Sequence, residues 1–271
     1  MHPSRYRRPK TLAEAKRMFA DAESASFLSG GHTLLPAMKL RLASPSDLID
    51  LGAIPELRGI KVEARTLAIG AATIHADVAA SPLVQQHLPA LAGLAGSIGD
   101  RHVRHRGTMG GSVSNNDPAA DYPSAVLGLG ATVVTDRRRI AADDFFVGLY
   151  QTAREPDEIL TRIEFPIPEI ASHAKFVSPA SRFSIAGVFI AKTGKSVRVA
   201  VTGAGSGGVF RATGLEAALA ADFRSQALVK CAIDPAHMLS DQNGTPEYRA
   251  NLVLVMARRA MENLGTISIY K

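Results

Sequence analysis

The chain has 271 residues, of which 46% are apolar, so it can bury a sizeable core in one large domain or two smaller ones. Its 31 Lys and Arg against 25 Asp and Glu give a net charge of +6, but scattered basic residues, 6% aromatic content and the absence of Trp argue against a nucleic-acid surface. The single cysteine, Cys231, excludes an internal disulfide and an iron–sulfur cluster held by this chain alone, because such a cluster needs about four thiolates.

The N-terminal part predicts a helix, then a strand that ends in a glycine turn. Thr11 and Glu14 have the spacing of a capping box, so a helix is expected to begin after Thr11. A strand over 25–29 runs into Gly30-Gly31-His32-Thr33, and a second helix is expected over 34–41. A glycine turn between strand and helix aims backbone N–H groups at an anion such as phosphate. His32 is either a ligand contact or an ordinary polar turn residue.

The next part of the chain alternates short strands and helices. A helix is expected from Pro89, because proline suits the first helical position. Thr73 is expected to cap a further helix, with Asp77 as an acid in its first turn. The run Arg137–Arg139 is expected at a solvated hairpin tip, and residues 145–150 as a loop or short helix with exposed aromatics. Strands are expected over 47–51, 66–71, 131–135 and 158–165.

A second glycine-containing stretch, RGTMGGSVSNNDPAADYP from Arg106 to Pro123, organises the chain. Its glycines let the backbone approach a ligand closely, and its successive N–H groups are expected to form an anion-binding nest. It also carries two carboxylates, Asp117 and Asp121. The basic run Arg101–Arg106 leads into it and suits anion binding or an acidic partner better than DNA. Two such loops suit one ligand with a pyrophosphate, although each also fits an ordinary glycine turn.

The C-terminal part begins near Pro166-Ile167-Pro168, where the composition changes. Strands over 185–192 and 196–202 flank Thr193-Gly194 and predict a hairpin. The residues 203–208 match GxGxxG formally, but Asp222 follows a helical segment, whereas the acid of a Rossmann fold ends a second strand. We therefore reject a cofactor site there. A long helix is expected over 246–263.

The sequence shows no signal for export or membrane insertion. No apolar run approaches about 18 residues, so no membrane span is expected. The N-terminus, MHPSRYRRPK, lacks the apolar stretch of a secretory signal. With one cysteine, the expected compartment is the reducing cytoplasm. No Ser/His/Asp or metal-ligand constellation stands out, so no catalytic or metal-binding side chain is assigned.

Three motifs follow one another along the chain: GGHTLLPAMK at 30–39, RGTMGGS at 106–112 and DPAAD at 117–121. Shorter matches lie at 158–160, 179–181, 201–204 and 247–249. In this combination the sequence resembles the FAD-binding medium subunit of the molybdenum hydroxylases, the xanthine dehydrogenase family, and is most similar to the aerobic carbon monoxide dehydrogenase type. The resemblance covers nearly the whole chain, and the paired glycine motifs are its most specific part.

The resemblance implies an α+β fold in two domains. The first, 1–168, is an FAD-binding domain of the PCMH or VAO type, with two α/β subdomains at about 1–58 and 59–168. The second, 169–271, is like the C-terminal domain of carbon monoxide dehydrogenase flavoproteins, a small antiparallel sheet with helices.

The resemblance also implies which residues bind FAD. Asp121 is expected to accept hydrogen bonds from FAD hydroxyls, and Asp117 likewise. Leu160 matches a position that packs near the flavin, and Lys175 lies in the region that approaches the isoalloxazine ring. Phe183 stands where carbon monoxide dehydrogenase relatives tend to have Tyr, so it can stack but cannot donate a hydrogen bond. The glycine loops are expected to contribute Gly30, Gly31, His32, Thr33, Leu34, Thr108, Gly110, Gly111 and Ser112.

The function implied is that of an electron-transfer oxidoreductase subunit with FAD on this chain. A small subunit with [2Fe–2S] clusters and a large molybdopterin subunit are the implied partners, assembled as a dimer of heterotrimers, with an external electron acceptor. The large subunit sets the substrate, so carbon monoxide, an aldehyde, a purine and an N-heterocycle all stay open. The alternatives are a self-sufficient FAD-dependent reductase of the same fold and a nucleotide-binding or nucleic-acid-binding module.

Overall fold

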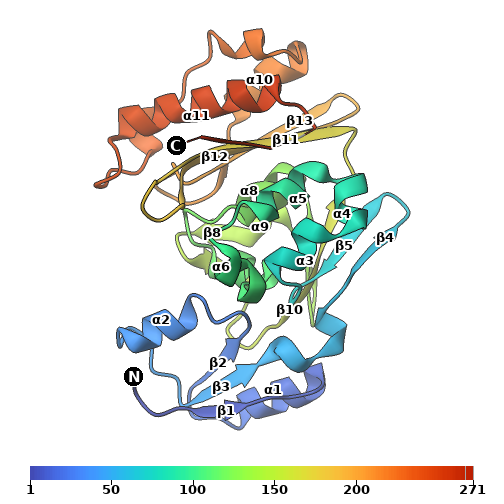
Figure 1. Ribbon diagram of the computed structural model, residues 1–271, viewed down its shortest axis with the longest axis vertical. Coiled ribbons are helices and arrows are strands. Elements are labelled where there is room, and N and C mark those ends of the chain that lie inside the picture. The colour runs from blue at the N-terminus through green and yellow to red at the C-terminus, as the bar shows by residue number, and fades with distance from the viewer. Residues whose placement is uncertain (266, 271) are drawn as a thin grey trace.

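The computed structural model describes residues 1–265 and 267–270, which form three main sheets that follow one another along the long axis of the molecule (Figure 1). An N-terminal sheet lies at one end, a middle sheet with most of the helices occupies the centre, and a C-terminal sheet covered by two helices forms the other end (Figure 1). The expected mixed fold of three parts is confirmed. Within the described residues, no helix is both long and apolar enough to cross a bilayer.

The N-terminal sheet has three parallel strands in the order β1-β3-β2, and the first helix packs on it. The predicted capping box begins this helix, because Thr11 Oγ1 accepts from the Glu14 N–H at 3.2 Å and the Glu14 carboxylate accepts from the Lys10 N–H at 2.8 Å. The elements are β1 (Arg5–Arg7), α1 (Leu12–Ala20), β2 (Ala25–Leu28), α2 (Leu34–Lys39) and β3 (Asp47–Asp50), followed by two short 3₁₀ turns at Leu51–Ala53 and Pro55–Leu57.

The middle sheet has five antiparallel strands in the order β4-β5-β10-β6-β7. The predicted hairpin with a charged tip is present, since β6 and β7 pair across a turn that holds Arg137 and Arg138. The elements of this part are β4 (Ile60–Glu63), β5 (Thr66–Gly70), α3 (His75–Ala80), α4 (Pro82–His87), α5 (Pro89–Gly96), α6 (Arg101–Arg106), α7 (Met109–Asn115), α8 (Tyr122–Gly128), β6 (Thr132–Thr135), β7 (Arg139–Ala141), α9 (Ala142–Phe145), β8 (Phe146–Gly148), β9 (Gln151–Thr152) and β10 (Leu160–Pro166).

The C-terminal sheet has the order β14-β13-β12-β11-β15. The predicted hairpin is confirmed as β12 and β13, but β15 runs parallel to β11, so the sheet is mixed and not purely antiparallel. Helices α10 and α11 cover one face, and α5 and α8 pack on the other (Figure 1). The elements are β11 (Ile170–Val177), β12 (Ser184–Thr193), β13 (Ser196–Thr202), β14 (Phe210–Arg211), α10 (Thr213–Ala221), two 3₁₀ turns at Ser225–Leu228 and Pro235–His237, α11 (Pro246–Glu262) and β15 (Ile267–Tyr270).

Three local expectations are wrong. Thr73 does not cap a helix, because α3 begins after Ile74 and the Thr73 hydroxyl instead donates to the Gly59 carbonyl at 3.3 Å. Phe145 is fully buried at the end of α9, whereas Tyr150 beyond it is exposed. The stretch 106–123 is not one loop, because it contains all of α7 and the start of α8.

The predicted boundaries at 58/59 and 168/169 fall between sheets. The first lies between the 3₁₀ turn Pro55–Leu57 and β4, and the second between β10 and β11. As divisions into a domain of 1–168, with its two subdomains, and a domain of 169–271, they stay predictions.

Two buried imidazoles lie in the middle and C-terminal parts. His75 in α3 is 4% exposed and His173 in β11 is fully buried. Burial lowers the pKa of each to about 4 from its ordinary 6.5, because the charged imidazolium loses its hydration. Neither nitrogen of His173 has a hydrogen-bond partner among the described residues.

These imidazoles make stability depend on pH. Below about pH 6.5 the unfolded chain protonates both, while the folded chain resists protonation down to about pH 4, so acid favours unfolding. We expect the free energy of unfolding to fall by up to about 1.4 kcal/mol per pH unit for each imidazole in this window. Urea unfolding at about pH 7.5, 6.5 and 5.5 measures the slope. His173→Leu removes no hydrogen bond among the described residues, so the free energy of unfolding should depend less steeply on pH in this variant. An unchanged pH dependence would contradict this account.

Candidate functional site

The two glycine motifs meet at a backbone-to-backbone contact. A Cβ atom placed on Gly30 would lie 2.7 Å from the Gly107 Cα and closer still to the Arg106 carbonyl oxygen, so only glycine fits. Beside this contact, the hydroxyls of Ser29 and Thr108 lie 2.8 Å apart and form a hydrogen bond. The end of β2 and the start of α7 therefore form one continuous surface. Ser29 is a member of this site that the family motifs do not single out.

The first motif presents a run of unused backbone donors. Within residues 1–265 and 267–270, no carbonyl or side chain accepts a hydrogen bond from the N–H groups of residues 30–34. Gly31 has φ +76°, a left-handed conformation that turns the chain between β2 and α2. The side chains of His32 and Thr33 are exposed. A run of unpaired N–H groups at such a turn is the arrangement that binds an anionic oxygen.

Most backbone donors of the second motif are already paired, which corrects the expected anion nest there; among the described residues only the N–H of Thr108 in residues 107–112 has no acceptor. The N–H groups of Met109 and Gly110 donate to the carbonyls of Thr73 and Ala71 at 3.0 and 2.8 Å. The Gly111 N–H donates to Thr108 Oγ1 at 3.1 Å, and the Ser112 N–H to the Thr108 carbonyl at 3.1 Å, so Thr108 is the N-cap of α7.

The glycines of the second motif serve different purposes. A Cβ on Gly110 would lie 2.5 Å from the Ala71 Cβ, so this glycine lets α7 pack closely on the end of β5. A Cβ on Gly111 would lie nearest to the Thr108 hydroxyl, at 2.8 Å, and next to the Ser29 side chain, at 3.7 Å. Gly111 is therefore the glycine at which a side chain would extend toward Ser29, the residue before the first motif.

The two aspartates have partners within the protein. Asp117 Oδ1 accepts from the Ala119 N–H at 2.8 Å, which folds its own loop into a turn. Asp121 is 7% exposed, and its two oxygens accept from Lys175 Nζ at 2.8 Å and from the Ser184 hydroxyl at 2.7 Å. The structure thus pairs Asp121 and Lys175, both predicted FAD contacts, with each other. Their contact with FAD stays a prediction.

Leu160 and Phe183 lie in contrasting surroundings. Leu160 is 5% exposed in β10, and its neighbour Thr161 accepts from the N–H of Ala71, the residue on which Gly110 packs. Leu160 therefore belongs to the core behind the second motif. Phe183 is 54% exposed in the turn between β11 and β12.

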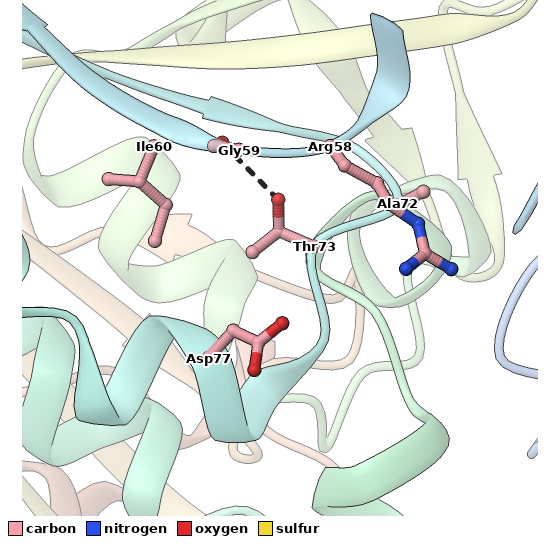
Figure 2. Close-up of a pocket in the computed structure, with 6 residues that line it drawn as sticks. All are labelled: Arg58, Gly59, Ile60, Ala72, Thr73 and Asp77. Carbon is pink, nitrogen blue, oxygen red and sulfur yellow. Dashed lines mark hydrogen bonds between the residues drawn. The ribbon is translucent and has the colours of Figure 1, made fainter. Parts of the chain in front are cut away.

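Two cavities lie outside the glycine motifs. One, of about 210 Å³, is lined by Arg58, Gly59, Ile60, Ala72, Thr73 and Asp77. Figure 2 shows the Asp77 side chain directed toward the Thr73 side chain, which bonds to Gly59. The other, of about 470 Å³, includes the glycine-rich turn of the rejected GxGxxG match. Asp222 ends α10 and pairs with Arg224 at 2.7 Å, and β13 is a hairpin strand, so the turn lacks the geometry of a Rossmann site.

Comparison with known proteins identifies the family. The FAD-binding domain of molybdopterin dehydrogenases matches residues 2–168. The carbon monoxide dehydrogenase medium chain of Hydrogenophaga pseudoflava is 36% identical over 94% of this chain and 95% of its own, and the nicotine 6-hydroxylase medium subunit of Paenarthrobacter nicotinovorans is 34% identical over 96% and 97%. Among solved structures, a chain of reconstituted CO dehydrogenase from Oligotropha carboxidovorans matches with a TM-score of 0.86 and 33% identity over 96% of both chains. The chain therefore belongs to the FAD-binding family of the molybdopterin dehydrogenases.

Proposed function

We propose that this chain is the FAD-carrying electron-transfer subunit of a heteromeric molybdenum hydroxylase. It accepts electrons from [2Fe–2S] clusters on a small partner subunit and passes them to an external acceptor, while a large molybdopterin subunit oxidises the substrate. Two observations support the partner subunits. The relatives are named medium chain and medium subunit. One similar structure is a carbon monoxide dehydrogenase that lacks the Mo-pyranopterin moiety of its molybdenum cofactor. We place the assembly, as a dimer of heterotrimers, in the cytoplasm.

The observation that carries the proposal is the run of unpaired N–H groups at residues 30–34 beside the second motif. These donors would hold the FAD pyrophosphate, because successive backbone N–H groups bind anionic oxygens without a charged side chain. Ser29 and Thr108 fix the second motif against them. The Ser112 hydroxyl makes no hydrogen bond among the described residues and would supply a further donor.

The remaining residues orient the cofactor. FAD supplies the redox chemistry when bound, so the chain needs no general acid or base of its own. Phe183 offers an exposed aromatic face for stacking. Leu160 closes the site from the core side.

The direct test is a visible absorption spectrum of the purified chain before and after addition of FAD, with the released cofactor identified. We expect flavin bands at about one equivalent per chain, since the chain has one pair of glycine motifs. Absence of binding, even with the iron–sulfur and molybdopterin subunits present, would refute the proposal. Co-purification of an iron–sulfur chain supports the electron-transfer role over a self-sufficient reductase.

Gly111→Val should abolish FAD retention, because its side chain would extend from α7 toward Ser29, the residue before the first motif. Gly207→Val is a suitable control, since no atom lies within 4 Å of a Cβ at Gly207 and this residue lies in the C-terminal part. Equilibrium titration with FAD measures both variants. Wild-type affinity in Gly111→Val would exclude the second motif from the site.

Gly30→Ala should damage stability as well as FAD binding, because its methyl group would force apart the backbones at Gly30 and Gly107. We expect a loss of at least about 2 kcal/mol in the free energy of unfolding, as for overpacked cores. Gly214→Ala, in α10 with no atom within 4 Å of its Cβ, should change it by less than about 1 kcal/mol, toward greater stability. Equal urea midpoints for the two variants would show that the motifs are not in contact.

A further inference from the structure

A buried cluster joins the FAD-binding part of the chain to the C-terminal sheet. Lys175 in β11 is fully buried, and its ammonium donates to Asp121 Oδ2 at 2.8 Å and to the Ser97 carbonyl at 3.2 Å. Ser184, the first residue of β12, is 3% exposed and donates to Asp121 Oδ1 at 2.7 Å. We name Asp121, Lys175 and Ser184 the buried joint. It connects α8 and the end of α5 with two adjacent strands of another sheet.

The backbone beside the joint is held by the same sheet. The Thr202 hydroxyl lies within hydrogen-bond distance of the Pro118 and Ala120 carbonyls, at 3.1 and 2.6 Å. The Gly203 N–H donates to the Pro118 carbonyl at 2.7 Å. The DPAAD motif at 117–121 is therefore bound to the ends of β12 and β13 along most of its length.

Because the joint is buried, it fixes the relative placement of the elements that carry its residues. A desolvated ion pair persists only with good geometry and complete hydrogen bonding, so it favours one relative placement of its two elements. The imidazoles of His75 and His173 are the other titratable groups that interact with Asp121, and both are neutral near pH 7 because burial lowers their pKa to about 4. The Tyr122 hydroxyl is buried and likewise uncharged. Lys175 is the positively charged side chain that pairs with the Asp121 carboxylate.

The joint sits at the base of the turn that carries Phe183. Lys175 precedes this turn by three residues, and Ser184 follows Phe183 directly. The turn is closed by hydrogen bonds from the Ser178 N–H to the Phe183 carbonyl at 2.9 Å and from the Arg182 N–H to the Ser178 carbonyl at 2.8 Å. In Figure 1 the connection between β11 and β12 extends toward α6. The pKa of Asp100, the N-cap of α6, is lowered chiefly by the hydrogen bond from the Val103 N–H and to a smaller extent by the charge of Arg182, which therefore lies near the start of α6.

We propose that Lys175 and Asp121 are positioning residues: their ion pair, with Ser184, fixes the turn at 178–183 relative to the two glycine motifs and so places the Phe183 ring against the flavin. This inference rests on the proposed function. It gives both residues a supporting role beside their predicted contact with FAD, and it makes DPAAD a connection between the middle part of the chain and the C-terminal sheet. Supporting residues of this kind hold a binding group within about 0.5 Å of its productive position.

The test is a thermodynamic cycle in the full chain. Removing one partner would leave a buried unpaired charge and threaten folding, so the joint is neutralised by the combined variant Asp121→Asn/Lys175→Met, which conserves side-chain volume. Phe183→Ala is then made in the wild-type and in the neutralised background, and the FAD dissociation constant is measured in all four proteins. Visible circular dichroism of the bound flavin reports the ring environment independently of affinity.

We expect Phe183→Ala to weaken FAD binding about tenfold in the wild-type background, as for loss of one aromatic contact. In the neutralised background the same change should cost less than about threefold, because the ring is no longer held in place. The neutralised variant should also change the flavin circular dichroism. An equal cost of Phe183→Ala in both backgrounds would overturn the inference, because Phe183 would then act independently of the joint.

A second variant separates positioning from direct contact. Thr202→Val removes the hydroxyl beside the Pro118 and Ala120 carbonyls without touching any residue predicted to bind FAD. Thr161→Val is its matched control, because Thr161 is also buried and donates to one carbonyl, that of Val134, within the middle sheet. Only Thr202→Val should change the flavin circular dichroism, and an equal change in both would refute positioning by the joint.

Amide hydrogen exchange at residues 178–183 distinguishes failure of this inference from failure of the proposed function. If the wild-type chain binds no FAD, the proposed function fails. In that case faster exchange of the turn in the neutralised variant would still establish the joint as its support. Unchanged exchange would overturn the joint whether or not FAD binds.

Discussion

The backbone contact between Gly30 and the Arg106-Gly107 peptide is the constraint on which the site depends. These residues come from parts of the chain whose sheets share no strand, and no side chain separates them. On its other side Gly107 packs against the buried His75 ring, which would lie 2.5 Å from a Cβ at this position. The imidazole therefore packs directly against the residue that contacts Gly30. The position of the first motif is therefore fixed by close packing that continues into the core.

The two glycine motifs divide the work in an unequal way. Among the described residues the N–H groups of residues 30–34 are unpaired, while those of Met109 to Ser112 in the second motif donate to the segment after β5 and to Thr108. The backbone of the second motif is therefore held in place by its own hydrogen bonds and packs against the first motif. It offers few free hydrogen-bond donors to a ligand. A site built from backbone groups depends on the path of the main chain more than on the identity of its side chains. A side chain added at Gly30 or at Gly110 would push two backbone segments apart, whereas one added at Gly111 would reach toward Ser29.

Local signals predicted local structure well. The capping box at Thr11, proline at the first position of α5 and the turn at Thr193-Gly194, where Gly194 has φ +57°, were all sufficient to place an element. Strand β11 escaped prediction because Ser172, His173 and Lys175 put polar groups at buried positions. The Ser172 hydroxyl donates to the Ala260 carbonyl 88 residues away, and Lys175 pairs with Asp121 54 residues away. Such partners exist only in the folded chain.

The same limit applies to the site. The sequence predicted that two glycine motifs serve one ligand, and the structure brings them into contact. It did not predict that most backbone donors of the second motif are already used, because the acceptors at Thr73 and Ala71 look like an ordinary strand end in the sequence. Nor did it separate residues that touch a ligand from residues that hold the contact in place, since both kinds lie in the same motifs.

DPAAD illustrates why a motif near a ligand is not necessarily a ligand contact. A motif residue can instead hold two parts of the chain together. A carboxylate can do this by pairing with a lysine of the C-terminal sheet, provided that water is excluded and both of its oxygens have donors. Asp121 satisfies both conditions through Lys175 and Ser184. The Asp117 carboxylate, half-buried and bonded chiefly within its own loop, remains the more available of the two for a hydroxyl of the cofactor.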